Sequence, residues 1–213
     1  MRYSMIGLMF AAMAAAAGGD SKPAADGFVQ LFNGKDLTGW KTHPDDKGCV
    51  WEVKDGAITA HGSAGHLFSE RGDYEDFIYR IEARINDGGN SGQYFRAPYK
   101  KSFPTYYEAQ INAKHSDPIK TGRLYPHYKR NLTDEQKKKL LVLKAPHEPN
   151  EWFTQEVTAI GNHIVIKVNG RTTVDFVDET NKSMKGHFAI QHHDPTCKIE
   201  VRKVEVKELP KGK

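Results

Sequence analysis

Apolar and polar residues alternate in short runs from Phe28 onward, and turn-forming residues separate these runs. A period of two residues is typical of strands with one buried face, and long stretches of helical periodicity are nearly absent. The sequence therefore predicts an all-β chain with strands over residues 28–32, 49–53, 57–61, 76–85, 92–97, 106–111, 152–161, 163–170, 172–177, 186–193 and 197–209.

Turn chemistry supports this succession of strands. Asn169-Gly170 lies between two alternating runs, and Asn-Gly supplies the two positive-φ positions that a type I′ hairpin requires. The segment INDGGNSG (85–92) is a second cluster of turn-forming residues, ahead of the strand that contains Arg96. Short strands at turn-bounded intervals are typical of an antiparallel β-sandwich.

The alternation also predicts which side chains share one face of a sheet. In three strands the face opposite the core carries a polar pair, while Phe95 and similar residues point into the core. Carboxylates, amides and a guanidinium can fix sugar hydroxyl groups while aromatic rings stack on the sugar, although ordinary solvent-facing residues would alternate in the same way. The three pairs are Tyr94 with Arg96, Glu108 with Gln110, and Gln191 with His193.

Composition limits the number of domains and the class of partner. The chain has 213 residues, of which 38% are hydrophobic and 27% charged, which is enough for one sizeable core. The formal net charge of +4 is modest and the signs are mixed, which argues against a nucleic-acid partner. The basic run 128–141 could bind phosphate, but a solvated helix that begins after a Thr133 cap is the favoured interpretation.

The N-terminal residues predict an exported protein. They combine Arg2, an apolar run and an Ala-rich exit, as in a cleaved signal peptide, and the run is too short to span a membrane. We expect a mature protein in the periplasm or outside the cell, without a membrane partner. The expected division is a signal peptide (1–17), a linker (18–26), one β-sandwich domain (27–209) and a tail (210–213).

A family resemblance rests on nine segments of the chain and on the order in which they follow one another. Together they resemble the 3-keto-disaccharide hydrolase family, long called a domain of unknown function, over essentially the whole mature chain. The resemblance implies a concanavalin-like (jelly-roll) antiparallel β-sandwich, here with one short helical insertion. The segments are GFVQLFNGKDLTGWKT (27–42), WEVKDGAITA (51–60), DFIYRIEARI (76–85), GGNSGQYFRAP (88–98), YEAQI (107–111), TGRLY (121–125), GNHIVIKVNGRTTVDF (161–176), GHFAIQHHD (186–194) and IEVRKVEVKEL (199–209).

The resemblance implies cleavage of glycosides or disaccharides whose ring already carries a ketone at carbon 3, so that a sugar 3-dehydrogenase would act upstream. Such a ketone acidifies the hydrogen on carbon 2, and the enolate can expel the glycosidic oxygen by β-elimination; water can then add back, for net hydrolysis. This chemistry needs a base near carbon 2, a donor at the enolate oxygen and an acid for the leaving oxygen, rather than the paired carboxylates of ordinary glycosidases.

Roles for the polar pairs follow from this chemistry. Arg96 is the first candidate for holding the ketone or enolate oxygen, with a structural ion pair to Glu108 as the alternative. Glu108 and His193 are the candidate base and acid, in an order that the sequence leaves open; His193 could instead be a surface or capping histidine beside Asp194. Candidate substrate-binding residues are Gln110, Gln191, Tyr94, Asn90 and Tyr125, although Asn90 could simply shape its turn and Tyr125 could pack in the interior.

No cofactor is certain from the sequence. A divalent cation that polarises the ketone suits the chemistry, but His192 and His193 point to opposite faces of a regular strand, and the sequence has no compact ligand motif. Cys49 and Cys197 could form one disulfide in an oxidising compartment, with two buried free thiols as the alternative.

Two non-enzymatic interpretations remain open at this point. A lectin-like carbohydrate-binding module explains the fold, the signal peptide and the polar and aromatic face equally well, because a shared fold does not establish catalysis. A structural adhesion module would share the fold and would bind no small sugar.

Overall fold

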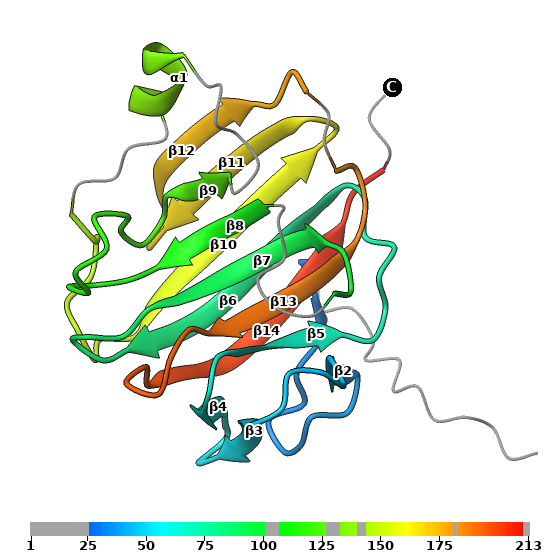
Figure 1. The fold of residues 1–213 in the computed structure, drawn as a ribbon. Coiled ribbons are helices and arrows are strands. Elements are labelled where there is room, and N and C mark those ends of the chain that lie inside the picture. The colour runs from blue at the N-terminus through cyan, green and yellow to red at the C-terminus, as the bar shows by residue number, and fades with distance from the viewer. Residues whose placement is uncertain (1–25, 101–106, 127–132, 140–143, 181–182, 211–213) are drawn as a thin grey trace, which may run out of the picture.

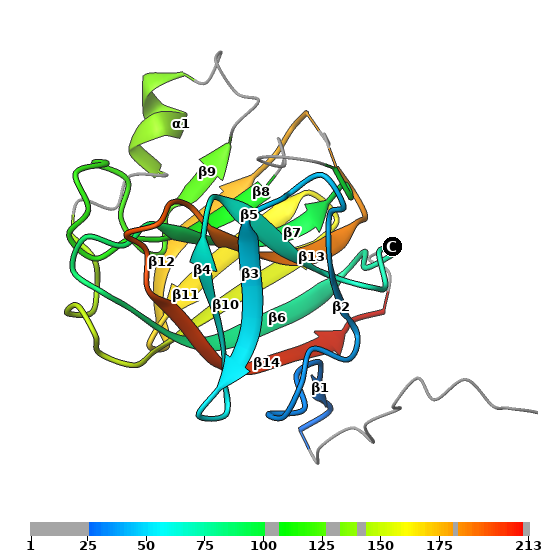
Figure 2. The ribbon, with the colours of Figure 1, turned by 60° about the horizontal axis from the view of Figure 1, so that its bottom comes forward.

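The chain folds into two antiparallel β-sheets that pack face to face, as Figures 1 and 2 show from two directions. Each sheet therefore has an inner face toward the core and an outer face. The only helix in the described part of the chain is the short α1 (Asp134–Lys139), so the predicted β-sandwich with one short helical insertion is confirmed. The structure is a computed structural model, and it describes residues 26–100, 107–126, 133–139, 144–180 and 183–210.

The larger sheet has eight strands in the order β12-β11-β10-β6-β14-β4-β3, with β1 paired to β14. The long strands β6, β10 and β14 form its centre, and their registers are antiparallel throughout. The bounds are β1 (Val29–Gln30), β3 (Cys49–Lys54), β4 (Ala57–Gly62), β6 (Phe77–Ile85), β10 (Phe153–Ile160), β11 (His163–Val168), β12 (Arg171–Val177) and β14 (Ile199–Glu208).

The smaller sheet has six strands in the order β2-β5-β13-β7-β8-β9, and Figure 1 is viewed onto it. Its central strands come from distant parts of the sequence, which brings the strands of the three predicted polar pairs together in one sheet. The bounds are β2 (Trp40–Thr42), β5 (Gly65–Ser69), β7 (Ser91–Ala97), β8 (Tyr107–Ile111), β9 (Leu124–Pro126) and β13 (His187–His192).

The core lies between the two inner faces and is rich in stacked aromatic rings. The side chains of β6 alternate between buried and half-buried along the whole strand, as the sequence predicts. Tyr79 of β6 stacks on Phe188 of β13 with ring centroids 3.9 Å apart, and Phe95 of β7 stacks on Tyr107 of β8 at 5.2 Å. Full burial of an aromatic side chain contributes about 1.5–3 kcal/mol, so the Tyr79–Phe188 stack stabilises the packing of one sheet on the other, while the Phe95–Tyr107 stack stabilises the pairing of β7 with β8.

Most predicted strands are present, with ends shifted by a few residues, and three are new. The Asn169-Gly170 hairpin is confirmed, since these residues have φ values of 50° and 77°. Helix α1 begins after Thr133, as predicted. Strands β2, β5 and β9 were not predicted, because they are only three to five residues long and do not show clear alternation.

Several predictions concern residues outside the described ranges. They include the signal peptide (1–17), nearly all of the linker (18–26) and the parts of the basic run that lie at 128–132 and 140–141. No helix in the described part of the chain is both long and apolar enough to cross a membrane.

Candidate functional site

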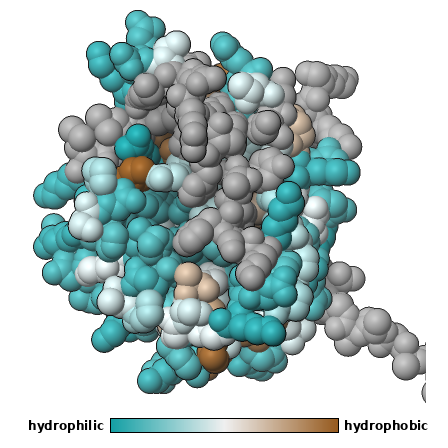
Figure 3. Space-filling view, in the orientation of Figure 1, coloured by the Kyte–Doolittle hydropathy of each residue, from teal (hydrophilic) through white to brown (hydrophobic). Residues whose placement is uncertain are grey.

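Four neighbouring strands place polar and aromatic side chains on the outer face of the six-stranded sheet. In the pairing of β7 with β8, Tyr94 lies opposite Glu108 and Gly92 opposite Gln110. Gln191 of β13 lies opposite His66 of β5, and Ala189 opposite Tyr94. The described surface on this side of the molecule is largely hydrophilic (Figure 3). The prediction that these strands bring Tyr94, Glu108, Gln110 and Gln191 onto one face is therefore confirmed.

The Glu108 carboxylate lies across β7, in space that is available because Gly92 has no side chain. A Cβ atom built on Gly92 would be 2.2 Å from Glu108 Oε1 and 2.7 Å from its Cδ. The Glu108 side chain is only 3% exposed. Gly92 therefore fixes where this carboxylate sits.

Tyr94 connects Glu108 to the strand on the other side of β7. Its phenol oxygen accepts a hydrogen bond of 2.9 Å from Gln191 Nε2, and its hydroxyl is also hydrogen-bonded to Glu108. His66 meets the Tyr94 ring edge-on, with centroids 5.1 Å apart, and its Nε2 lies 3.5 Å from Gln191 Nε2. Burial and the charge of Glu108 raise the pKa of Tyr94 well above its usual value, so the phenol stays protonated.

The remaining candidate substrate-binding residues surround this centre. Tyr125 of β9 lies opposite Glu108, on the side away from Tyr94, and burial raises the pKa of its hydroxyl. Gln110 is buried, and Gln191 Oε1 is buried without a hydrogen-bond partner in the described structure. Asn90 is also buried and its Oδ1 has no partner among the described residues, so its part in substrate binding stays a prediction beside the alternative that it shapes the turn before β7.

Arg96 does not lie beside Glu108, so the predicted position is wrong. The register between β7 and β13 shifts between His187 and Ala189, so that β7 has one extra residue there. Arg96 takes up this β-bulge with a left-handed φ of 49°. A bulge reverses the alternation that places a side chain on one face or the other. Arg96 is consequently carried away from the outer face on which Tyr94 lies.

The Arg96 guanidinium instead joins three chain segments and is fully buried. Its Nε and Nη2 donate to the carbonyl oxygen of Glu75 at 2.9 and 2.7 Å, and Nη1 donates to that of Gly161 at 2.6 Å. Its ion-pair partner is Asp76, at 3.2 Å, which also corrects the alternative of an ion pair with Glu108. Arg96 therefore has a structural place in the molecule.

His193 lies at the end of β13, one alternation beyond Gln191, and is partly exposed. Its Nδ1 is 3.0 Å from Asp194 Oδ2, and its ring centroid is 6.1 Å from that of His115. Asp194 in turn accepts a bond from the backbone N–H of Thr196, as in a turn. These contacts match the interpretation of His193 as a capping histidine beside Asp194 and place it at the rim of the polar face.

Two polar residues of this face, His66 and Arg123, were not predicted from the sequence. His66 lies in the unpredicted strand β5, and no signal in its short, wholly buried segment identified a strand. Arg123 lies opposite Gln110, whose N–H donates to its carbonyl oxygen at 2.9 Å. Its Nε is buried without a hydrogen-bond partner in the described structure, and burial lowers the pKa of its guanidinium. Arg123 lies in the segment TGRLY (121–125), which was the sequence signal that could have identified it as a site residue.

Both cysteines are buried free thiols, so of the two alternatives left open by the sequence the structure has the free thiols and not the disulfide. Cys49 Sγ lies 3.9 Å from Nδ1 of the buried His192, whose Nε2 lies 3.2 Å from the carbonyl oxygen of Cys197. Burial, followed by the charge of Asp46, raises the pKa of Cys49 to about 11, and burial raises that of Cys197 to about 12. Burial and a raised pKa both disfavour the reactive thiolate form of these cysteines.

The described residues contain no group of three or more His, Cys, Asp or Glu side chains arranged to hold a metal ion. The divalent cation considered above therefore has no assigned ligands.

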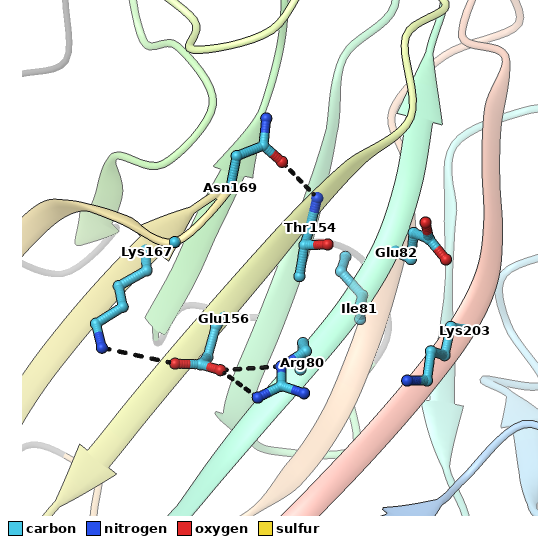
Figure 4. Close-up of a pocket in the computed structure, with 9 residues that line it drawn as sticks. Arg80, Ile81, Glu82, Thr154, Glu156, Lys167, Asn169 and Lys203 are labelled. Atoms are coloured by element: carbon cyan, nitrogen blue, oxygen red, sulfur yellow. Dashed lines mark hydrogen bonds and ion pairs between the residues drawn. The ribbon is translucent and has the colours of Figure 1, made fainter.

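A polar groove of about 440 Å³ lies on the opposite side of the molecule, on the outer face of the eight-stranded sheet (Figure 4). Arg80 contacts Glu156 and Glu205, each at 2.8 Å, while Lys167 lies 3.9 Å from Glu156. Lys203 contacts Glu205 at 2.8 Å. These charges neutralise one another across four strands, which is typical of a solvated sheet face.

Comparisons with known proteins match this architecture. The chain is 32% identical over 83 residues to a Bacteroides thetaiotaomicron protein named 3-keto-disaccharide hydrolase, a match that covers 34% of this chain and only 28% of that relative. The crystal structure of a candidate glycosyl hydrolase from Parabacteroides distasonis is 25% identical, with a TM-score of 0.65 over 90% of this chain and 100% of the other.

A third comparison concerns the fold alone. The carbohydrate-binding module CBM66 of Bacillus subtilis is 16% identical and superposes with a TM-score of 0.56, over 80% of this chain and 96% of that module. The expected jelly-roll class is thereby confirmed. The model of the 3-keto-alpha-glucoside-1,2-lyase-like domain matches residues 27–207, and the chain therefore belongs to this family, in which the 3-keto-disaccharide hydrolases fall.

Proposed function

We propose that this chain cleaves the glycosidic bond of a sugar whose carbon 3 has been oxidised to a ketone, with Glu108 as the base that removes the proton on carbon 2. The observation that carries the proposal is the position of the Glu108 carboxylate, buried on the polar outer face and held across Gly92. A carboxylate fixed in place and shielded from water is suited to abstract a weakly acidic proton. Membership of the family and the name of the Bacteroides relative support this substrate class.

The proposed reaction proceeds through an enolate. Glu108 takes the proton from carbon 2, and the electrons of that bond move toward the ketone oxygen. When the ketone re-forms, a double bond appears between carbons 1 and 2 and the glycosidic oxygen leaves. Addition of water at carbon 1, with return of a proton to carbon 2, then gives the net products of hydrolysis.

Arg123 takes the role that the sequence had suggested for Arg96. It is a permanent cation on the same outer face, opposite Gln110, and its buried Nε is a donor without a partner in the described structure. A guanidinium aimed at the ketone would stabilise the negative charge that develops on the enolate oxygen. The amides of Gln110 and Gln191 are suited to hold sugar hydroxyl groups.

The biological context is part of the same proposal. An oxidised sugar must be supplied by an enzyme that removes hydride from carbon 3, so we place a sugar 3-dehydrogenase upstream. The N-terminal segment would direct the chain to the periplasm or out of the cell. N-terminal sequencing of the protein recovered from that compartment tests the export: a start near Gly18 supports it, and an intact Met1 contradicts it.

Proton NMR of the protein with a 3-keto-disaccharide in deuterated water tests the reaction, with the unoxidised disaccharide alongside. We expect cleavage of the keto sugar alone, with deuterium appearing on carbon 2, and at least a 100-fold loss in Glu108→Gln. Glu52→Gln, on the exposed side of edge strand β3, is the matched control and should retain full activity.

Other outcomes would contradict the proposal. Equal cleavage of both sugars would point to an ordinary glycosidase. Chemical-shift changes without cleavage would identify a carbohydrate-binding module, and loss of activity with a chelator would assign the polarising role to a metal ion instead of Arg123.

A further inference from the structure

The hydrogen bonds of Tyr94 direct its proton toward Glu108. The two residues lie directly opposite each other on β7 and β8. The phenol oxygen accepts from Gln191 Nε2 at 2.9 Å, and in its hydrogen bond with Glu108 the O–H is the donor, because the carboxylate can only accept. While Glu108 is ionised, a phenol held between an amide donor and this carboxylate acceptor keeps one orientation.

The burial of this pair restricts where a proton can go. Tyr94 is fully buried and Glu108 is 3% exposed, so neither exchanges protons freely with bulk water. A proton that Glu108 removes from the substrate must therefore pass to a neighbouring group before the next turnover. The Tyr94 oxygen is hydrogen-bonded to the carboxylate and is placed to receive it.

We infer that Tyr94 is the general acid of the reaction, and that Tyr94 and Glu108 form one proton relay. This inference rests on the proposed function. Glu108 takes the proton from carbon 2 as the enolate forms. Once Glu108 is a carboxylic acid, it donates to the Tyr94 oxygen, and the Tyr94 hydroxyl proton turns from Glu108 to the glycosidic oxygen. Tyr94 gives this proton to the glycosidic oxygen as the bond from carbon 1 to oxygen breaks, and the resulting tyrosinate takes the proton from the Glu108 carboxylic acid. Both side chains return to their starting states, and the pair exchanges no net proton with solvent.

The relay predicts that the need for Tyr94 depends on the leaving group. A sugar alkoxide is a poor leaving group and must be protonated as it departs, whereas a nitrophenolate departs without a proton. The loss of a general acid typically costs about 10²–10⁴-fold in rate. The phenylalanine variant should lose this factor only with the poor leaving group.

The test compares kcat/KM of Tyr94→Phe with that of the wild type on a 3-keto-disaccharide and on 3-keto-nitrophenyl glucoside. We expect at least a 100-fold loss on the disaccharide and a loss below about fivefold on the nitrophenyl glycoside. The ratio of the two activities within one preparation does not depend on the fraction of folded protein. Partial unfolding of the variant therefore cannot produce the expected result.

Tyr125→Phe is the matched control, because Tyr125 flanks Glu108 from the other side, on β9. Its ratio of activities should equal that of the wild type. Equal losses on both substrates in Tyr94→Phe would overturn the relay, and a selective loss in Tyr125→Phe would assign the acid to Tyr125 instead. A wild type that cleaves neither keto sugar would overturn the proposed function itself, and the inference with it.

Discussion

Replacing Gly92 with alanine should displace the Glu108 carboxylate while leaving the strand intact. The new Cβ would meet Glu108 Oε1 at 2.2 Å, whereas such contacts are essentially never shorter than 3.0 Å. The carboxylate must therefore retreat by about 1 Å. The φ angle of Gly92 lies outside the left-handed region, so alanine can adopt the same backbone.

The expected effect is large on activity and small on stability. A displacement of about 1 Å at a reacting group costs about 100-fold in rate, which corresponds to about 2.7 kcal/mol of transition-state stabilisation. Alanine gains about 0.5–1 kcal/mol over glycine in a strand through the lower entropy of the unfolded chain. Crowding of the Glu108 side chain opposes this gain, with a cost of about 1–3 kcal/mol.

The assay is kcat/KM on a 3-keto-disaccharide, together with the free energy of unfolding in urea. Gly88→Ala is the control, because no heavy atom lies within 4 Å of a Cβ at that position. Glu108→Asp shortens the side chain by one methylene, so the Gly92→Ala effect should shrink in that background. Activity of Gly92→Ala within threefold of the wild type, or an equal loss in Gly88→Ala, would refute the reasoning.

Three further predictions concern stability and reactivity. Arg96→Ala should lower the free energy of unfolding in urea by about 3–5 kcal/mol, because it leaves buried carbonyl oxygens without donors. Arg84 is half-exposed, and Arg84→Ala should lower the same free energy by less than about 1 kcal/mol. Equal losses in the two variants would contradict the structural role of Arg96. Burial lowers the pKa of His147 below its usual 6.5, so the unfolded chain binds the proton more tightly and stability falls as the pH drops below about 6.5. Urea unfolding between pH 7 and 5 should show a shallower decline in His147→Gln, and an unchanged slope would count against this. Burial raises the pKa values of Cys49 and Cys197 to about 11 and about 12, so both should react with iodoacetamide at pH 8 only after unfolding. Mass spectrometry would detect the labelled cysteines, and rapid labelling of the folded chain would disprove their burial.

The sequence was sufficient to place Tyr94, Glu108, Gln110 and Gln191 on the polar side of their own strands, because alternation is a local property of a strand. These four residues share one face only because β7, β8 and β13 are neighbours in the sheet. The alternation of polar and apolar residues could suggest this arrangement of strands but not establish it. Strand β5, with His66, escaped prediction for a physical reason. It is buried on both faces, and a short strand of this kind has no alternation to detect.

Arg96 could not be placed from the sequence because its position depends on contacts with distant segments. Alternation assumes one residue per step on both strands, and the bulge opposite Phe188 breaks that rule. The carbonyl oxygens of Glu75 and Gly161 stabilise the bulged position, and they lie in loops that no local pattern connects to β7. A regular strand and a bulged strand therefore have the same local sequence signature here.

The bulge also has a consequence for the chemistry of the outer face. Had Arg96 continued the alternation, it would share that face with Tyr94 and compete with the phenol for the Glu108 carboxylate. A guanidinium in that place would hold the carboxylate in a charge-assisted pair and oppose its protonation by substrate. The bulge instead uses the charge of Arg96 to join three chain segments, with Asp76 as its ion-pair partner. The same local irregularity therefore stabilises the sandwich and leaves the Tyr94 hydroxyl as the neighbour of Glu108, which the proposed proton transfer requires.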